Sequence, residues 1–206
     1  MGNYSLWPLF LAFGINTPPV SVEAYGTTTC NITDQVSSPH RNDVAFPYSS
    51  IIHFKFPAQK EWEPFDLFWY DGGMKPARPD ELDADKELPR EGMMFVGDSG
   101  KILGSFHCGQ PRIIPEKKMF EFLGTEEIPE DTTERTANIW LDSFLSGEQS
   151  PGSFLYAGPV TETILLAAVA LQAGRKIEWD AENMKVTNIE DANKFLYREY
   201  RPGWEL

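Results

Sequence analysis

A run of alternating apolar and polar side chains constrains the fold of this chain more than any other feature. In SSIIHFKFPA, residues 49–58, the side chains of Ile52, Phe54 and Phe56 fall on one face of an extended backbone, and the intervening ones, including His53, fall on the other. Successive side chains of a strand point to opposite faces. This period of two therefore predicts a strand with one buried and one accessible face.

Further strand signals dominate the first half of the chain. They cover SVEAYGTT (21–28), FDLFWYDGG (65–73), the hairpin GMMFVGDSGKILGSF (92–106), the short edge-like PRIIPE (111–116) and, later in the chain, RKIEWD (175–180). The stretch up to Ser38 reads as a polar loop, and residues 75–90 read as a long, acidic surface loop dotted with prolines.

The first apolar run, residues 6–13, predicts a short core helix with Pro8 in its first turn and Gly14 at its end. A secretory signal is the alternative, but the first basic residue of the chain is Arg41, so the basic region that such a signal requires is absent. A membrane span needs about 20 apolar residues, and the prolines at 18 and 19 follow too soon. Because nothing precedes this helix to pack against it, we expect a segment upstream to be missing.

Helix signals dominate the second half. Asp131 and Glu134 form a capping-box-like start, and Gly147 ends the helix that follows. Its apolar stripe consists of Ala137, Trp140, Leu141, Phe144 and Leu145. A more buried helix is predicted from Pro159 to Gly174, and Asn188 is predicted to cap a last helix.

This order of elements predicts an α+β fold: an open, mostly antiparallel, mixed sheet with helices packed on one face. Residues 1–206 are expected to form a single domain, with the other sheet face free for a partner. The apolar share of 41% and aromatic share of 13% indicate a folded globule, and the net charge of −13 argues against nucleic acid or an anionic membrane as partner. Cys30 and Cys108 are expected to be buried free thiols, with one disulfide as the alternative.

Few motifs of known chemistry occur. The sequence contains no dinucleotide-binding G-x-G-x-x-G, no phosphate-binding loop and no nucleophile elbow. GDSGK joins two predicted strands, so it reads as a hairpin turn. His40, His53 and His107 lack the spacing of metal ligands, no metal site is expected, and His53 is expected to point outward from its strand.

One candidate binding site lies at the end of a predicted strand. In FWYDGG, Trp69 and Tyr70 offer flat amphipathic rings and Asp71 a carboxylate, a set of groups that can hold a sugar. The alternative is structural, because aromatic strand residues are commonly core and Asp-Gly-Gly is ordinary turn chemistry.

A second candidate is the loop PHRND, which places His40, Arg41 and Asn42 side by side before a strand. These groups could bind a polyol or a carboxylate, and a solvated loop is the alternative. From the residues alone, the sequence supports a soluble α+β domain without a complete catalytic set.

Several stretches together resemble a known family. RNDVAFPYSSIIHFKFPA, WYDGGMKPARPDEL, GMMFVGDSGKIL, YAGPVTETILLAAVALQAGRKIEWDAENMKVTN and the closing REYRPGWEL look, in this order, like the C-terminal domain of Gfo/Idh/MocA-type oxidoreductases of the Bacteroidetes branch. The resemblance covers nearly the whole chain. It implies a sheet whose open face mediates oligomer contacts, and sugars, inositols or their derivatives as substrates.

The same resemblance implies a partner that these residues do not include. Members of the family carry an N-terminal Rossmann domain that binds NAD(P), and neither its fingerprint nor the family's Glu-Lys-Pro motif occurs here. The chain is then a substrate-binding and oligomerisation half, without cofactor or catalysis of its own, and its compartment, cytoplasm or periplasm, stays open. Laying Gly2 and Pro8 onto the family pattern puts Tyr4 and Trp7 where relatives carry a histidine and an aspartate that assist proton transfer. A phenol can donate a proton, but an indole cannot act as a base.

Two alternatives remain. The chain could be a non-enzymatic carbohydrate-binding or dimerisation module. It could also be a secreted hydrolase, which would need a pair of carboxylates in a cleft.

Overall fold

The computed structural model describes residues 2–40, 42, 44–59, 62–128 and 138–204. The chain groups into two compact units. Unit 1 comprises Met1–Asn16 and Pro76–Val160, and unit 2 comprises Thr17–Lys75 and Thr161–Leu206.

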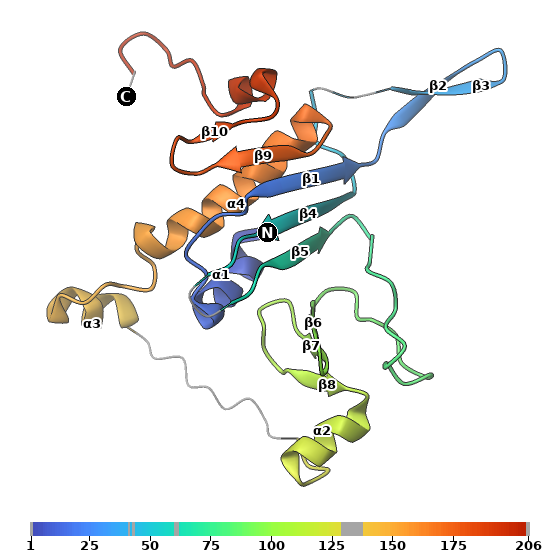
Figure 1. The fold of residues 1–206 in the computed structure, drawn as a ribbon, viewed down its shortest axis with the longest axis vertical. Helices are drawn as coiled ribbons and strands as arrows, with labels where there is room; N and C mark the ends of the chain where they lie inside the picture. Colours follow the sequence, from blue (N-terminus) through green and yellow to red (C-terminus); the bar gives the residue numbers. More distant parts are fainter. Residues whose placement is uncertain (1, 41, 43, 60–61, 129–137, 205–206) are drawn as a thin grey trace. The chain divides into compact units, whose positions relative to one another are not determined.

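A five-stranded sheet organises unit 2 (Figure 1). Its strands lie in the order β10 (Lys185–Val186), β9 (Ile177–Asp180), β1 (Ser21–Gly26), β4 (Ser50–Phe56) and β5 (Phe65–Tyr70). Every pairing among these strands is antiparallel. The predicted α+β class and the antiparallel character of the sheet are therefore confirmed.

The register separates the sheet into two faces. Val22 pairs with Phe54 and Ile52 with Trp69, which places these side chains on one face, where Val22, Ile52 and Phe54 are buried. The pairing of His53 with Phe68 belongs to the other face. The alternation predicted for β4 is confirmed.

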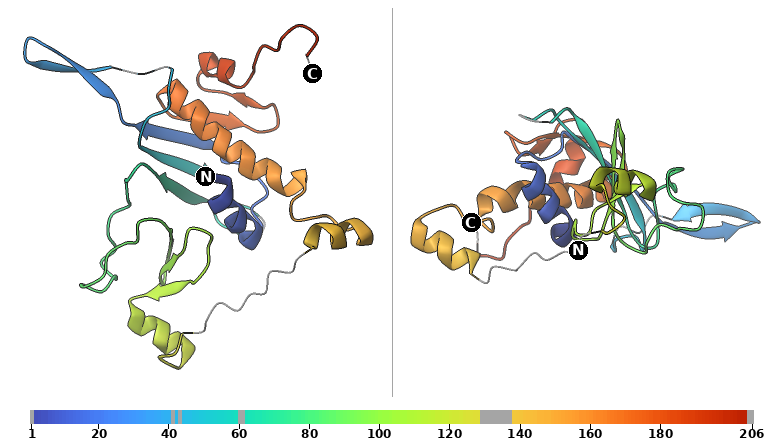
Figure 2. Two further views of the ribbon diagram at one scale, coloured as in Figure 1. Left: turned by 180° about the vertical axis from the view of Figure 1, so that it is seen from behind. Right: turned by 90° about the horizontal axis from the view of Figure 1, so that it is seen from below.

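The long helix α4 (Phe154–Ala173) continues from unit 1 into unit 2, and its residues 161–173 cover the apolar face of this sheet, as the view from behind shows (Figure 2). Thr163, Leu166 and Ala170 recur at helical spacing and are buried. The predicted start at Pro159 is wrong, because the helix begins before it and Pro159 lies inside. By length and composition α4 could cross a membrane, which is weak evidence because core helices of soluble proteins meet the same test.

Side-chain amides fix the end of unit 2. The Asn193 amide accepts a hydrogen bond from the Val186 N–H at 2.8 Å and donates one to the Val186 carbonyl at 3.0 Å. Asn193 lies in η1 (Glu190–Phe195), a 3₁₀ helix. The predicted cap at Asn188 is wrong, since its amide bridges the backbones of Glu178 and Lys176 instead.

A two-stranded arm, β2 (Thr29–Thr33) and β3 (Val36–His40), replaces the polar loop expected there. Every residue of both strands is exposed. Asp34 and Gln35 at its tip have φ of 52° and 66°. These left-handed conformations suit a two-residue hairpin turn, but the usual glycine signal is missing from the sequence.

The described part of unit 1 contains a three-stranded sheet, three helices and the start of α4. Its strands lie in the order β6 (Met93–Gly97), β7 (Gly100–Gly104) and β8 (Arg112–Ile114), as the predicted hairpin and edge segment imply. Helix α1 (Gly2–Phe13) begins earlier than predicted, so Pro8 lies well inside it. Helix α2 (Glu116–Leu123) was not predicted, and it ends at Gly124 in the left-handed conformation.

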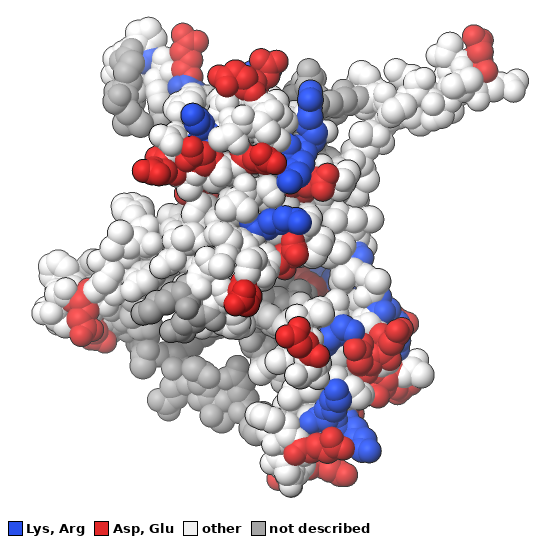
Figure 3. Space-filling model, in the orientation of Figure 1, with Lys and Arg blue, Asp and Glu red and all other residues white. Residues whose placement is uncertain are grey.

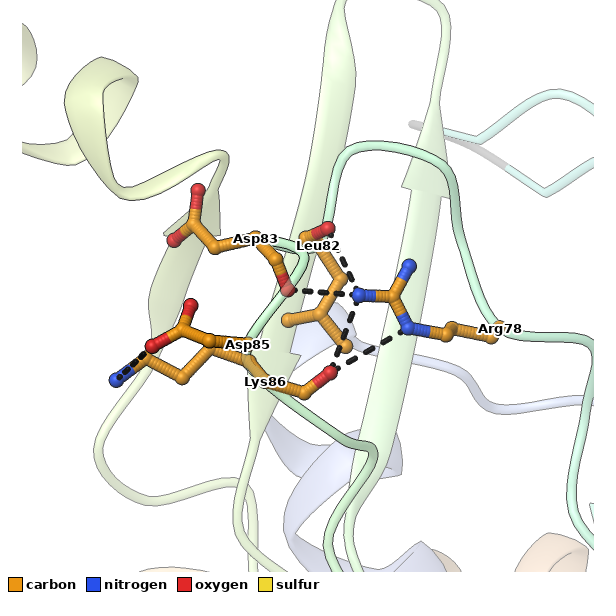
Figure 4. Close-up of polar contacts among 5 residues, drawn as sticks. All are labelled: Arg78, Leu82, Asp83, Asp85 and Lys86. Carbon is orange, nitrogen blue, oxygen red and sulfur yellow. Dashed lines mark hydrogen bonds and ion pairs between the residues drawn. The ribbon is translucent and has the colours of Figure 1, made fainter.

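Arg78 organises the predicted surface loop between β5 and β6 (Figure 4). Its guanidinium donates to the carbonyls of Leu82, Asp83 and Lys86 at 3.1, 2.7 and 3.1 Å. Nearby, Lys101 of β7 holds Glu81 at 2.6 Å. The loop lacks helix and strand, but these contacts give it a defined path.

Helix α3 (Ile139–Ser146) ends at Gly147 as predicted, and none of its residues is buried. Asp131, Glu134 and Ala137, predicted to begin this helix, lie outside the described residues. The described members of its predicted apolar stripe, Trp140, Leu141, Phe144 and Leu145, are exposed.

Candidate functional site

The Asp71 carboxylate closes the end of the β4–β5 pair. Oδ1 accepts hydrogen bonds from the Ser50 backbone N–H at 2.6 Å and from the Ser50 hydroxyl at 3.0 Å. Oδ2 accepts one from the Trp69 indole N–H at 3.2 Å. This carboxylate is committed to the fold, so the structural interpretation of FWYDGG is the one that its geometry favours.

Two glycines complete this turn. Gly72 has φ of +61°, and a Cβ there would lie 2.3 Å from the Tyr48 carbonyl oxygen and from the Ser49 Cβ. Only glycine fits such a close approach in this conformation. Of the predicted set, the structure brings Trp69 and Asp71 together, while Tyr70 is half-buried on the opposite face of β5.

The second predicted cluster is described only in part. His40 ends the exposed arm, paired with Thr29, and Arg41 lies outside the described residues. The Asn42 side chain accepts hydrogen bonds from the N–H groups of Val44 and Ala45 at 2.9 and 3.0 Å, a local turn. Within the described part of unit 2, no hydrogen bond joins His40 or Asn42 to the Asp71 cluster.

Tyr4 and Trp7 lie three residues apart on α1 and hence on neighbouring positions of one helix face. Tyr4 is exposed and Trp7 half-buried. Trp7 lines a hollow of about 130 Å³. The other lining residues are Phe10, Leu11, Gly14, Ile15, Asn16, Tyr156 and Val160. No carboxylate, lysine or histidine is among these described lining residues, so the hollow offers apolar surface and no base.

Pro8 and His107 explain how α1 is held. Pro8 has no N–H, so it cannot bond to the carbonyl four residues earlier, which is that of Tyr4. His107 Nδ1 lies 3.1 Å from this carbonyl oxygen. Because a carbonyl only accepts, Nδ1 carries the proton in this contact. With Pro8 expected in the first helical turn, the sequence predicts neither this orphaned carbonyl nor its donor, which is distant along the chain.

The open face of the unit 2 sheet is the other candidate surface. His53 lies on it as predicted, 2.6 Å from Asp66 and stacked on Phe68 with ring centroids 4.3 Å apart. Tyr25 donates to Glu23 at 2.7 Å, and this hydrogen bond is the main cause of its raised pKa. Exposed Tyr25 and Phe68 give the face aromatic surface framed by charges.

Other titratable groups offer little chemistry. No cluster of three or more potential metal ligands occurs in the described residues. Both cysteines are free, but the expectation that both are buried is wrong, because Cys30 on the arm is exposed. Burial raises the pKa of the half-buried Cys108, which lowers its reactivity.

Comparison with protein-family models, with curated proteins and with solved structures gave no match.

Proposed function

We propose that the chain is the substrate-binding and oligomerisation half of an NAD(P)-dependent sugar or polyol oxidoreductase of the Gfo/Idh/MocA type, inactive alone. One observation carries this proposal: the unit 2 sheet has one face covered by α4 and one open face with exposed aromatic rings. A sheet that leaves such a face in solvent suits a surface that meets another protein.

The resemblance of the sequence supports the proposal further. WYDGG covers the last two residues of β5 and the turn after it, and FVGDSGK lies in the β6–β7 hairpin. Both motifs serve the fold through Asp71, Gly72 and the turn at Asp98, so their joint presence speaks for a shared architecture more than for a shared active site.

The described residues do not fit a dinucleotide. A pyrophosphate needs a glycine-rich turn between a strand and a helix N-terminus. The direct strand-to-helix step of unit 1, from β8 to α2, runs through Pro115 without glycine. NAD(P) therefore belongs, in this proposal, to a Rossmann half that is not among these residues.

Tyr4 is the candidate contact to the substrate. Its exposed phenol can donate a hydrogen bond or a proton to a polyol oxygen, whereas the Trp7 indole supplies only apolar surface and a donor. A base has to come from elsewhere, which agrees with a chain that binds but does not react.

Thermal shift against a panel of sugars and polyols tests the binding half of the proposal. At least one compound should raise the melting temperature, and Tyr4→Phe should reduce the shift. Tyr197→Phe removes a phenol from a similarly exposed residue and should leave it unchanged. An equal effect of both variants would exclude Tyr4 as a contact.

Light scattering tests the oligomerisation half. Phe68→Lys places a charge on the open sheet face and should lower the molecular mass. Phe46→Lys, at an exposed loop position of the same unit, should not.

The second candidate function, a dimerisation or carbohydrate-binding module without enzymatic role, is favoured by the absence of a base among the residues that line the hollow. Association without a response to any sugar would support a scaffold. Micromolar binding of NAD by this chain would contradict both candidates.

A further inference from the structure

A second exposed apolar surface lies in unit 1. It consists of six large side chains on α3 and the start of α4, here called the α3 patch. Their exposed fractions are 70% for Trp140, 41% for Leu141, 71% for Phe144, 73% for Leu145, 94% for Phe154 and 72% for Leu155.

Helical spacing gathers the α3 members on one face. Trp140 and Phe144 are four residues apart, as are Leu141 and Leu145, so two apolar rows run side by side. The rings of Trp140 and Phe144 stack with centroids 5.7 Å apart and planes at 13°. Both rings are mostly exposed, so the stack presents aromatic surface to solvent.

Phe154 and Leu155 begin α4, and a short connection of local turns joins α3 to them. Ser146 Oγ accepts a hydrogen bond from the Glu148 N–H, and Ser150 Oγ accepts one from the Gly152 N–H. The Ser153 N–H donates to the Ser150 carbonyl at 2.9 Å. The start of α4 thus follows α3 through successive local turns.

The summed exposure of these side chains sets an upper limit that is close to the area of a specific interface. With roughly 180 Å² for each large apolar side chain, the six together expose on the order of 800 Å². Monomers rarely leave apolar patches above a few hundred Å², and a standard interface buries about 800 Å² per partner.

The low charge around the α3 patch allows a second copy of the chain to be the partner. Two copies of a chain with net charge −13 repel each other, except where they meet through surface with little charge. Residues 138–160 contain two acidic residues, Asp142 and Glu148, and no lysine or arginine. Figure 3 accordingly shows no blue over α3.

We propose that the α3 patch is a self-association surface, on which two copies pack α3 against α3 about a two-fold axis. A two-fold contact uses the same patch on both copies, so the area of one patch suffices for each side. The Trp140–Phe144 stack lies at the centre of the contact. This proposal does not depend on the proposed function, which places a different contact on the unit 2 sheet.

Sedimentation equilibrium of matched variants tests it. Phe144→Glu puts a charge into the contact and should weaken association at least about 30-fold, the effect of losing one interface hot spot. Phe122→Glu changes a phenylalanine that is 75% exposed on α2, also a helix of eight residues in unit 1, and should leave association unchanged. Both positions are exposed, so the two variants should fold alike, which circular dichroism verifies.

Hydrogen exchange localises the contact. Raising the protein concentration should slow amide exchange in residues 139–146 and 154–156 of the wild type but not of Phe144→Glu. Equal association of Phe144→Glu and Phe122→Glu would overturn the proposal. A molecular mass that Phe68→Lys lowers and Phe144→Glu does not would also overturn it, because association would then use only the sheet face of unit 2. Binding of the monomer to neutral phosphatidylcholine vesicles through Phe144 would overturn it as well.

Discussion

At the scale of residues, single groups fix this fold at points where the backbone would otherwise lack a partner or collide. Asp71 gathers the backbone and side chain of Ser50 and the indole of Trp69 at one strand end. His107 lies against the carbonyl that Pro8 leaves without its helical donor. The FWYDGG motif marks Asp71 and its neighbour Trp69 as candidates, but Ser50 and His107 are distant along the chain from the groups that they contact, and only the fold brings them together.

Gly72 and Gly73 provide a matched test at this scale. Gly72→Ala should destabilise the chain by at least about 2 kcal/mol, because the left-handed backbone costs alanine about 1 kcal/mol and the new Cβ collides with Tyr48 and Ser49. A Cβ at Gly73 meets nothing within 4 Å, so Gly73→Ala should cost only about 1 kcal/mol for its φ of +90°. Urea unfolding measures both, and equal losses would contradict the collision.

Glu81 predicts a pH dependence. The hydrogen bond from Lys101 is the main cause of its lowered pKa. A lowered pKa in the folded state stabilises the fold above the ordinary value near 4.5, and this contribution disappears as the pH falls through the lowered pKa. Glu81→Gln should therefore lower the melting temperature at about pH 7, with a smaller difference at about pH 3.

The matched control for Glu81 is Glu87→Gln, an exposed residue of the same loop. The melting temperature of Glu87→Gln should equal that of the wild type at both pH values. A difference between Glu81→Gln and wild type that persists unchanged in acid would contradict the role of the Lys101 hydrogen bond.

At the scale of elements, what can be predicted follows from how local the signal is. The alternation of β4 and the apolar pattern of α4 locate these elements, since one side of each is buried. The sequence does not predict the arm, because its turn is made by Asp34 and Gln35 without a glycine. The start of α4 was misplaced because a proline is commoner at the first position of a helix, whereas Pro159 lies further inside.

We expect the Arg78 guanidinium to stabilise the path of the loop between β5 and β6. Arg78→Lys should speed the exchange of the Leu82 and Lys86 amides at least about tenfold, because a single ammonium cannot reach three carbonyls as the guanidinium does. Arg90→Lys, at an exposed position of the same region, is the control. Unchanged exchange in Arg78→Lys would show that the loop holds its path without this guanidinium.

At the scale of the whole molecule, the chain combines strong negative charge with two exposed surfaces that carry large apolar side chains. On the open sheet face of unit 2 these side chains alternate with charged groups, and in unit 1 they form the α3 patch. The open sheet face was predicted from the order of strands and helices. The α3 patch was not, because its stripe of apolar residues has the same spacing as a buried one, and only the structure shows that its described residues are exposed. In the two proposals above, each surface contacts another protein chain.

The most direct test of the central claim is calorimetric titration of the chain with a panel of sugars and polyols, alongside NAD and NADP. The account predicts saturable binding of at least one sugar or polyol, weakened by Tyr4→Phe, and no heat of binding with either nucleotide. Micromolar binding of NAD or NADP, or the absence of binding for every sugar and polyol at millimolar concentration, would contradict it.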